Sequence, residues 1–178
     1  MSDIRKQEQC AAAAILGVRE VEFLKNPDSD IYPTPELRKD LVYSIRTYKP
    51  NLLLTHDPTV RIADDSRINH PDHIAVGETA LTAAFPLARD RLNYPEHGEQ
   101  GLETHKVMQF MLTGSQQPNI WVDVSETLER KITALREHHS QIGDPDVLAE
   151  KIRERAQQYA QDRTMKYAER FRLIQLNR

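Results

Sequence analysis

The apolar run at residues 51–55, NLLLT, constrains the fold more than any other stretch of the chain. It lies between Pro50 and the polar triplet at residues 56–58 (HDP). After a helical pattern, such a run favours a strand buried on both faces of a parallel sheet. In open α/β sheets, ligands gather beyond the carboxyl ends of the strands. A functional site is therefore expected in the residues that follow Thr55.

The segments around this strand alternate between helical and extended patterns. Thr34 and Pro35 are typical of a helix start, and Pro50 ends that helix. We also predict a first helix that ends at Gly17 and another that begins at a capping Ser125. The remaining predicted strands lie over 18–24, 107–112 and 119–124, with a polar loop at 26–30 and an irregular binding loop at 86–101. The predicted helices lie over 1–16, 71–84, 125 to about 141, and about 145–176, the last with an interruption left open. This alternation predicts an α/β sandwich.

The polar loop after the central strand leads to the sequence His70-Pro71-Asp72-His73. Proline suits the first position of a helix, so His70 is predicted as the N-cap. Asp72 in the first turn is favoured by the positive end of the helix dipole. Two imidazoles at the mouth of a helix suit a metal ion or an anionic intermediate.

A catalytic zinc needs about three protein ligands, usually histidines with a carboxylate, and a position for water. Five side chains could assemble such a site if the loops converge, namely His56, Asp57, His70, Asp72 and His73. A carboxylate beside a histidine that does not bind metal would fix its tautomer for oxyanion stabilisation or general acid catalysis. Spacing alone leaves open which histidine binds metal, and residues 56–58 are more often a simple turn.

Composition limits the classes of partner. The 178 residues predict one domain over residues 1–178, and a net charge of -3 gives no reason to expect nucleic acid. The single cysteine, Cys10, fits a reducing compartment, and no apolar run approaches the roughly 20 residues of a membrane span. We therefore expect a cytoplasmic protein without a membrane span, and the sequence leaves a homo-oligomer open.

Several motifs together resemble the LmbE/PIG-L family of metal-dependent de-N-acetylases. The residues at 70–73 (HPDH) match a specific signature of that family. Residues 5–8 (RKQE) with 16–18 (LGV), 50–56 (PNLLLTH) and 138–141 (HHSQ) resemble its other motifs. The resemblance implies a Rossmann-like three-layer sandwich with a mainly parallel sheet. It also implies hydrolysis of an N-acetylglucosamine-type amide with zinc or another divalent metal, acting on a small N-acetylated amino-sugar conjugate.

Roles pass to this chain residue by residue through that resemblance. It implies that His73 is a metal ligand, and that His70 stabilises the tetrahedral intermediate or protonates the leaving amine. It implies that Asp72 orients His70. Arg5 is then expected to line the substrate pocket, and Asp28 to contact sugar hydroxyls. Before the resemblance is considered, Arg5 with Glu8 is simply a solvated ion pair in a helix.

One family motif has no counterpart in these 178 residues. The resemblance implies His-Pro-Asp-Asp after a first strand, with two further metal ligands and a general base, but nothing at a matching position provides it. We therefore expect a first strand-helix-strand unit to be missing. The alternative to a deacetylase is a catalytically impaired remnant that acts as a sugar- or partner-binding module.

Overall fold

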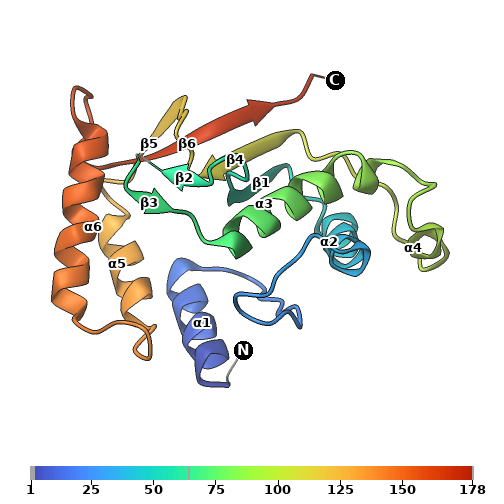
Figure 1. Cartoon of the computed structure of the whole chain (residues 1–178), viewed down its shortest axis with the longest axis horizontal. Helices are drawn as coiled ribbons and strands as arrows, with labels where there is room; N and C mark the ends of the chain where they lie inside the picture. Colours follow the sequence, from blue (N-terminus) through green and yellow to red (C-terminus); the bar gives the residue numbers. More distant parts are fainter. Residues whose placement is uncertain (1–2, 64, 178) are drawn as a thin grey trace. The chain divides into compact units, whose positions relative to one another are not determined.

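The structure is a computed structural model that describes residues 3–63 and 65–177, and the chain forms two compact units within it. Unit 1 comprises residues 3–26 and Trp121–Arg170, and unit 2 comprises Pro27–Ile120 and residues 171–177. Helices and a sheet are both present, which confirms an α/β fold (Figure 1). The assignment of residues 1–178 to one domain stays a prediction. No described helix has the length and apolar character needed to span a membrane.

Unit 1 is built from three helices, α1 (Asp3–Leu16), α5 (Leu128–Arg136) and α6 (Pro145–Ala160). It also holds most of strand β5 (Ile120–Asp123) and the start of β6 (Ala168–Gln175). Its core combines leucine and isoleucine from α5 with alanines from α6, namely Leu128, Ile132, Ala149 and Ala156. Helix α1 ends as predicted, because Gly17 adopts the left-handed conformation with φ +75°.

Helix α1 buries a carboxylate. Glu8 is 8% exposed and accepts hydrogen bonds from the backbone N–H and the hydroxyl of Ser140, at 2.6 and 2.7 Å. These bonds to Ser140 lower the pKa of Glu8. The interpretation of Glu8 as half of a solvated pair with Arg5 is therefore wrong, since Glu8 ties α1 to the segment after α5. Arg5 instead donates to Oε1 of Gln141 at 2.5 Å.

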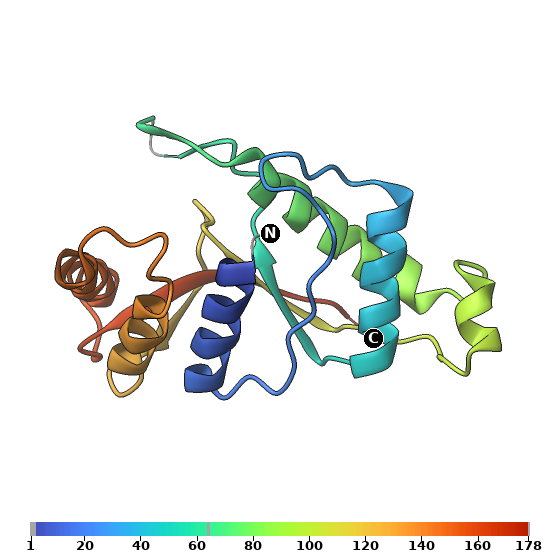
Figure 2. The ribbon, with the colours of Figure 1, turned by 90° about the horizontal axis from the view of Figure 1, so that it is seen from below.

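Unit 2 places two helices, α2 (Pro35–Tyr48) and α3 (Pro71–Ala84), with three sheet strands. Strand β1 (Leu52–His56) pairs in parallel with β4 (Gln109–Thr113), and β4 pairs antiparallel with β6. The strand order is β1-β4-β6-β5, so β1 is an edge strand. A hairpin of β2 (Ile62–Ala63) and β3 (Arg67–Ile68) extends from the start of α3 (Figure 2). The finer prediction of a Rossmann-like three-layer arrangement stays a prediction.

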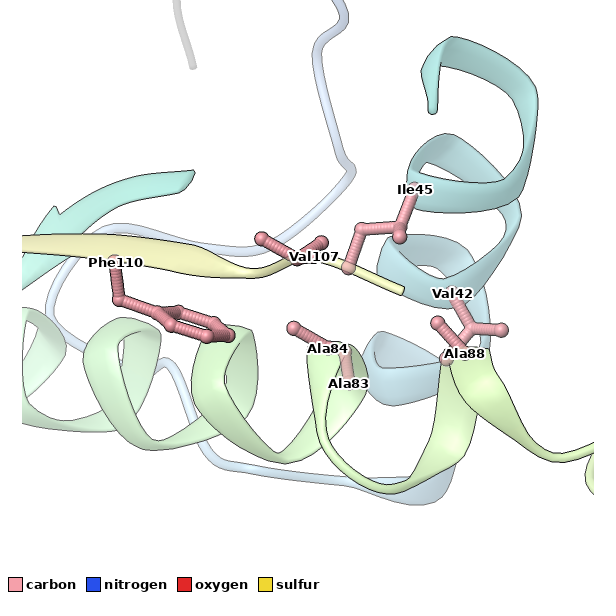
Figure 3. Packing of buried hydrophobic residues seen from close by; sticks show 7 residues of the cluster. All are labelled: Val42, Ile45, Ala83, Ala84, Ala88, Val107 and Phe110. Carbon is pink, nitrogen blue, oxygen red and sulfur yellow. The ribbon is translucent and has the colours of Figure 1, made fainter. Parts of the chain in front are cut away.

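The core of unit 2 lies between α2, α3 and the strand β4. Its buried members are small or β-branched except for one aromatic ring: Val42, Ile45, Ala83, Ala84, Ala88, Val107 and Phe110. Figure 3 shows Phe110 and Val107 facing the alanines at the end of α3. Small side chains let the helix approach the strand closely, and that approach sets the position of the first turn of α3 relative to the end of β1.

Two predicted elements are wrong because a strand depends on a hydrogen-bonded neighbour that local sequence does not reveal. Residues 18–24 form no strand, and Val18 and Leu24 are 49% and 38% exposed. β-Branched residues favour extended backbone, but a strand also needs a hydrogen-bonded neighbour. The predicted long helix over 145–176 ends at Ala160. Residues 168–175 instead form β6, because the backbone of β4 pairs with them by antiparallel hydrogen bonds.

Smaller corrections concern caps and burial. Ser125 does not cap a helix. Its hydroxyl donates a hydrogen bond to Asp123 and accepts one from the backbone N–H of Lys166. Helix α5 begins only at Leu128. Leu54 in β1 is 58% exposed, so β1 is not buried on both faces. The supposedly irregular loop at 86–101 contains a short 3-10 helix, η1 (Leu87–Arg89), and α4 (Pro95–Glu99).

Candidate active site

The site begins with the cap of helix α3, which forms as predicted. His70 has extended backbone, Pro71 occupies the first helical position, and Nδ1 of His70 accepts the N–H of Asp72 at 3.2 Å. A neutral imidazole that accepts at Nδ1 carries its proton on Nε2. The side chain of His70 is 42% exposed, so this Nε2–H can be offered to a ligand.

Asp72 anchors a distant loop. Its carboxylate is 6% exposed and accepts the backbone N–H of Ser29 at 2.7 Å and of Ile31 at 3.3 Å. These bonds bring the polar turn at residues 28–29 to the start of α3. The nearest approach of Asp72 to Nδ1 of His70 is 3.9 Å, longer than a hydrogen bond. Its predicted role in orienting His70 therefore stays a prediction.

Three imidazoles gather where β1 ends and α3 begins. The rings of His56 and His73 are stacked, with centroids 3.9 Å apart and planes 5° apart, and the ring of His70 lies 5.4 Å from that of His73. Burial, and then the charge of His73, lowers the pKa of His56. Burial, and then the charge of His70, likewise lowers the pKa of His73, against the opposing charge of Asp72. The stacked pair is therefore favoured in its neutral form.

Asp57 forms a buried carboxylate beside this cluster. Burial alone raises its pKa, but the hydroxyl of Ser115, both donors of Thr59 and the charge of Arg172 outweigh it, so the pKa is lowered. Sequence reasoning missed Ser115. The signal was present, because β1 and β4 are parallel and residues just beyond their carboxyl ends meet at one edge.

The donor atoms present are a partial fit to a divalent metal. Among the described residues, Asp28, His70 and Asp72 offer ligand atoms that all lie within 4.8 Å of one another. Two carboxylates and an imidazole suit zinc and several other divalent ions. His73, the ligand implied by resemblance, is not in this group. The rings of His73 and His56 lie in nearly parallel planes, so their in-plane lone pairs do not meet at one ion about 2.0–2.1 Å from both.

The predicted site residues divide between the two units. Asp28, His70, Asp72 and His73 belong to unit 2, where the first three lie together. Arg5 belongs to unit 1. Its role as a substrate ligand stays a prediction.

The lowered pKa values predict how stability depends on pH. Unfolded histidines take up protons near their ordinary pKa of about 6.5, whereas His56 and His73 in the folded protein do so only at lower pH. The unfolded state thus binds more protons as pH falls, and the free energy of unfolding should decrease between about pH 7 and pH 5. Urea unfolding of the metal-free protein at both pH values measures this decrease.

The variant His56→Gln should show a smaller decrease over the same pH interval. A matched variant, His139→Gln, changes an exposed histidine of unit 1 and should keep the wild-type decrease. An equal pH dependence in wild type and His56→Gln would contradict the assignment.

Comparisons with known proteins point to one family. The family model PIG-L, described as GlcNAc-PI de-N-acetylase, matches residues 1–84, which include the 70–73 motif. The diacetylchitobiose deacetylase of Thermococcus kodakarensis is 31% identical over 137 residues, which are 77% of this chain and 49% of that protein. The chain thus spans about half the length of this curated relative.

Solved structures share the fold. The N,N'-diacetylchitobiose deacetylase of Pyrococcus horikoshii, solved with an inhibitor, superposes with a TM-score of 0.84 at 27% identity, over 97% of this chain and 63% of that one. GalB of Pseudomonas putida KT2440, a 4-carboxy-2-hydroxymuconate hydratase, gives 0.75 at 20% identity, over 99% and 73%. A hydratase on this fold shows that the fold alone does not set the reaction. These matches support membership of the PIG-L (LmbE-like) family, whose model covers residues 1–84 of the chain.

Proposed function

We propose that this chain carries part of the active site of a metal-dependent de-N-acetylase that acts on an N-acetylglucosamine-type amide. The observation that carries the proposal is the joining of Asp28, His70 and Asp72 at the first turn of α3. Two relatives named as diacetylchitobiose deacetylases support this substrate class. The chain spans 49% of the Thermococcus relative and 63% of the Pyrococcus one, so the assignment of this activity to these residues is itself part of the proposal.

A divalent metal such as zinc, when bound, polarises the amide carbonyl and lowers the pKa of water. The residues available to hold it are His73, by resemblance, and the group of Asp28, His70 and Asp72, by geometry. The two sets differ in which histidine is a ligand. If His73 leaves its stack on His56 to bind metal, His70 stays free for the reaction.

We assign to His70 the stabilisation of negative charge. Hydrolysis adds water across the amide: the acyl carbon gains a hydroxyl, the C–N bond breaks, and the amine gains a proton as acetate leaves. During addition the carbonyl oxygen becomes an oxyanion. Since the Asp72 N–H holds Nδ1 of His70 as an acceptor, Nε2–H is the donor left for this oxygen. This geometry favours oxyanion stabilisation over protonation of the amine as the role of His70.

Metal content tests the proposal directly. After loading with zinc and dialysis, the protein should retain about one zinc per chain, and His73→Ala should lose it. Asp28→Ala should retain zinc if His73 is the ligand, as the resemblance implies. It should lose zinc if Asp28, His70 and Asp72 hold the metal. His139→Ala, which removes an exposed histidine of unit 1, should behave as the wild type. Retention of zinc in both His73→Ala and Asp28→Ala would contradict both ligand sets.

Acetate release from diacetylchitobiose measures the reaction. The zinc-loaded wild type should release acetate, and His70→Ala should reduce the rate by about 10²–10³, the effect of losing one oxyanion donor. His139→Ala again serves as the control. Zinc binding without acetate release in the wild type would reject the hydrolase for this chain.

A binding module is the second candidate, and one observation favours it. Strand β1 pairs with β4 along one edge, and no described strand occupies the other. Leu52 and Leu54 on this strand are 38% and 58% exposed. An open edge with exposed leucines is a place where another polypeptide could add a strand. Protection of the β1 backbone amides from hydrogen exchange when another polypeptide is added, with no acetate release from diacetylchitobiose, would support this candidate over the enzyme.

A further inference from the structure

Helix α4 carries a buried histidine that the proposed reaction does not use. His97 is 2% exposed. Its ring stacks on that of Tyr94, with centroids 5.4 Å apart and planes 24° apart. The ring of Tyr43, on α2, lies nearly perpendicular to it, with centroids 5.6 Å apart. The contact with Tyr43 holds α4 against α2.

One ring nitrogen of His97 is buried without a hydrogen bond. Nδ1 has no partner among the described residues. A neutral imidazole tolerates this, because with its proton on Nε2 the other nitrogen is only an unused acceptor. A protonated imidazole carries N–H donors on both nitrogens, so Nδ1–H would become an unpaired buried donor on a cation. The surroundings of Nδ1 therefore favour the neutral form.

The charges around His97 act in the same direction. Arg46 and Lys39 face it from α2, and Glu96 precedes it on α4. Burial lowers the pKa of His97 most, and the charge of Arg46 lowers it further, against the opposing charge of Glu96. Oε1 of Glu96 lies 2.5 Å from Nζ of Lys39, so its charge is largely offset by that of the lysine. A proton on His97 would add a second cation beside Arg46.

The chain is anchored on both sides of α4, and residues 95–104 between the anchors are held more weakly. Before them, the carbonyl of Tyr94 accepts the guanidinium of Arg46 at 3.3 Å, and after them the N–H of His105 donates to the carbonyl of Ala88 at 3.0 Å. His97 is the one buried residue of 95–104, all of which the structure describes.

The other links of residues 95–104 are weak. Two exposed ion pairs join them to α2 and the residue after it, Lys39–Glu96 and Lys49–Glu103, and such pairs contribute little to stability. A hollow of about 540 Å³ beside them is lined by Arg46, Arg91, Gly98, Leu102 and Glu103, among others. Moving residues that border such a space breaks few van der Waals contacts.

We propose that residues 95–104 form a flap that opens when His97 takes up a proton. In the closed flap the imidazolium would be a buried cation next to Arg46 with an unpaired donor. Opening exposes the imidazolium to water, and a five-residue helix released from α2 does not persist on its own. The core of unit 2 stays intact, because the flap contributes no residue to it.

The opening should follow pH in one direction. In the open flap His97 takes up a proton near its ordinary pKa of about 6.5, whereas the lowered pKa in the closed flap delays this uptake to lower pH. The open form thus binds more protons as pH falls, and its population should rise by up to about tenfold between about pH 7 and pH 5.5. Carboxyl groups ordinarily titrate near about pH 4, so this interval separates His97 from Glu96 and Glu103.

Hydrogen exchange measured by NMR on the whole chain tests the flap. Protection factors, which correct for the intrinsic pH dependence of exchange, would be compared at about pH 7 and about pH 5.5. The amides of Gln100 and Leu102, which donate to the carbonyl of His97, should lose protection by up to about tenfold. His97→Phe keeps an aromatic ring but takes up no proton, so these amides should keep equal protection at both pH values. His139→Phe, at an exposed position of unit 1, should show the wild-type loss.

Two results would overturn the flap. One is an equal loss of protection in wild type and His97→Phe, because His105 and the carboxylates are the same in both proteins. The other is equal protection of the flap and β4 amides in the wild type at about pH 5.5, which would mean that the whole of unit 2 opens. Should His97→Phe fail to fold, the wild-type protein still decides through its imidazole C–H resonances. His97 should titrate below about pH 6.5, and titration at or above that value rejects the proposal.

Discussion

Replacing Arg46 with methionine should lower the free energy of unfolding by about 3–5 kcal/mol, measured by urea denaturation. Arg46 is 2% exposed, and its guanidinium donates to five backbone carbonyls, those of Leu87, Ala88, Asp90, Asn93 and Tyr94. Hydrogen bonds to a charged group contribute about 1.5–3 kcal/mol each, though not additively. Methionine fills a similar volume but leaves these carbonyls without donors.

The substitution Arg46→Lys should have an intermediate effect. Lysine keeps the positive charge but has three donors on one nitrogen, whereas the guanidinium presents five in a fixed plane. Arg91→Met is the matched control, because Arg91 is an exposed arginine in the same segment. A loss of stability for Arg46→Met no greater than that for Arg91→Met would show that the segment at 87–94 does not depend on the guanidinium.

Arg46 also shows where sequence reasoning reached its limit. The start of α2 at Thr34 and Pro35 and the start of α3 at His70 and Pro71 were predicted because each cap is made by neighbouring residues. The organisation of residues 86–101 was not, because its donor lies more than 40 positions away on α2. Local chemistry is visible in a sequence, and a long-range hydrogen bond is not.

The same distinction explains the strands. The run at 51–55 was correctly predicted as extended, yet its burial was overestimated because a sequence does not show that β1 lies at a sheet edge. Residues 168–175 became a strand because β4 lies beside them, although Tyr167, Phe171 and Ile174 are spaced as on a helix. Residues 18–24 lack such a neighbour and stay irregular.

The site divides in a similar way. The motif at 70–73 identified a helix start with two imidazoles, and the structure adds what surrounds it. The bonds of Asp72 to Ser29 and Ile31 span more than 40 residues, as their donors lie in the loop after α1. The stacking of His56 on His73 depends on how closely α3 approaches β1. That approach depends in turn on a glycine that the sequence pattern did not single out.

Replacing Gly77 with alanine should lower the free energy of unfolding by about 1–3 kcal/mol, the usual cost of overpacking. A Cβ atom at Gly77 would lie 2.4 Å from the carbonyl oxygen of His56 and 3.2 Å from Cδ of Pro58. Neither a backbone carbonyl nor a proline ring can turn away, so α3 would have to move off β1. In a helix interior, replacing glycine with alanine normally raises stability by about 1 kcal/mol. A loss of stability in Gly77→Ala would therefore report the steric contact.

Gly98→Ala is the matched control, because a Cβ there would meet nothing within 4 Å and should leave stability unchanged or slightly improved. The same pair of variants reports on the site. Gly77 follows His73 by four residues and shares its helix face, so a shift of α3 should separate the stacked rings of His73 and His56. The imidazole C–H resonances of these two histidines should move in Gly77→Ala and stay in place in Gly98→Ala. Unchanged resonances in a destabilised Gly77→Ala variant would mean that the first turn of α3 holds the stack independently of the packing at Gly77.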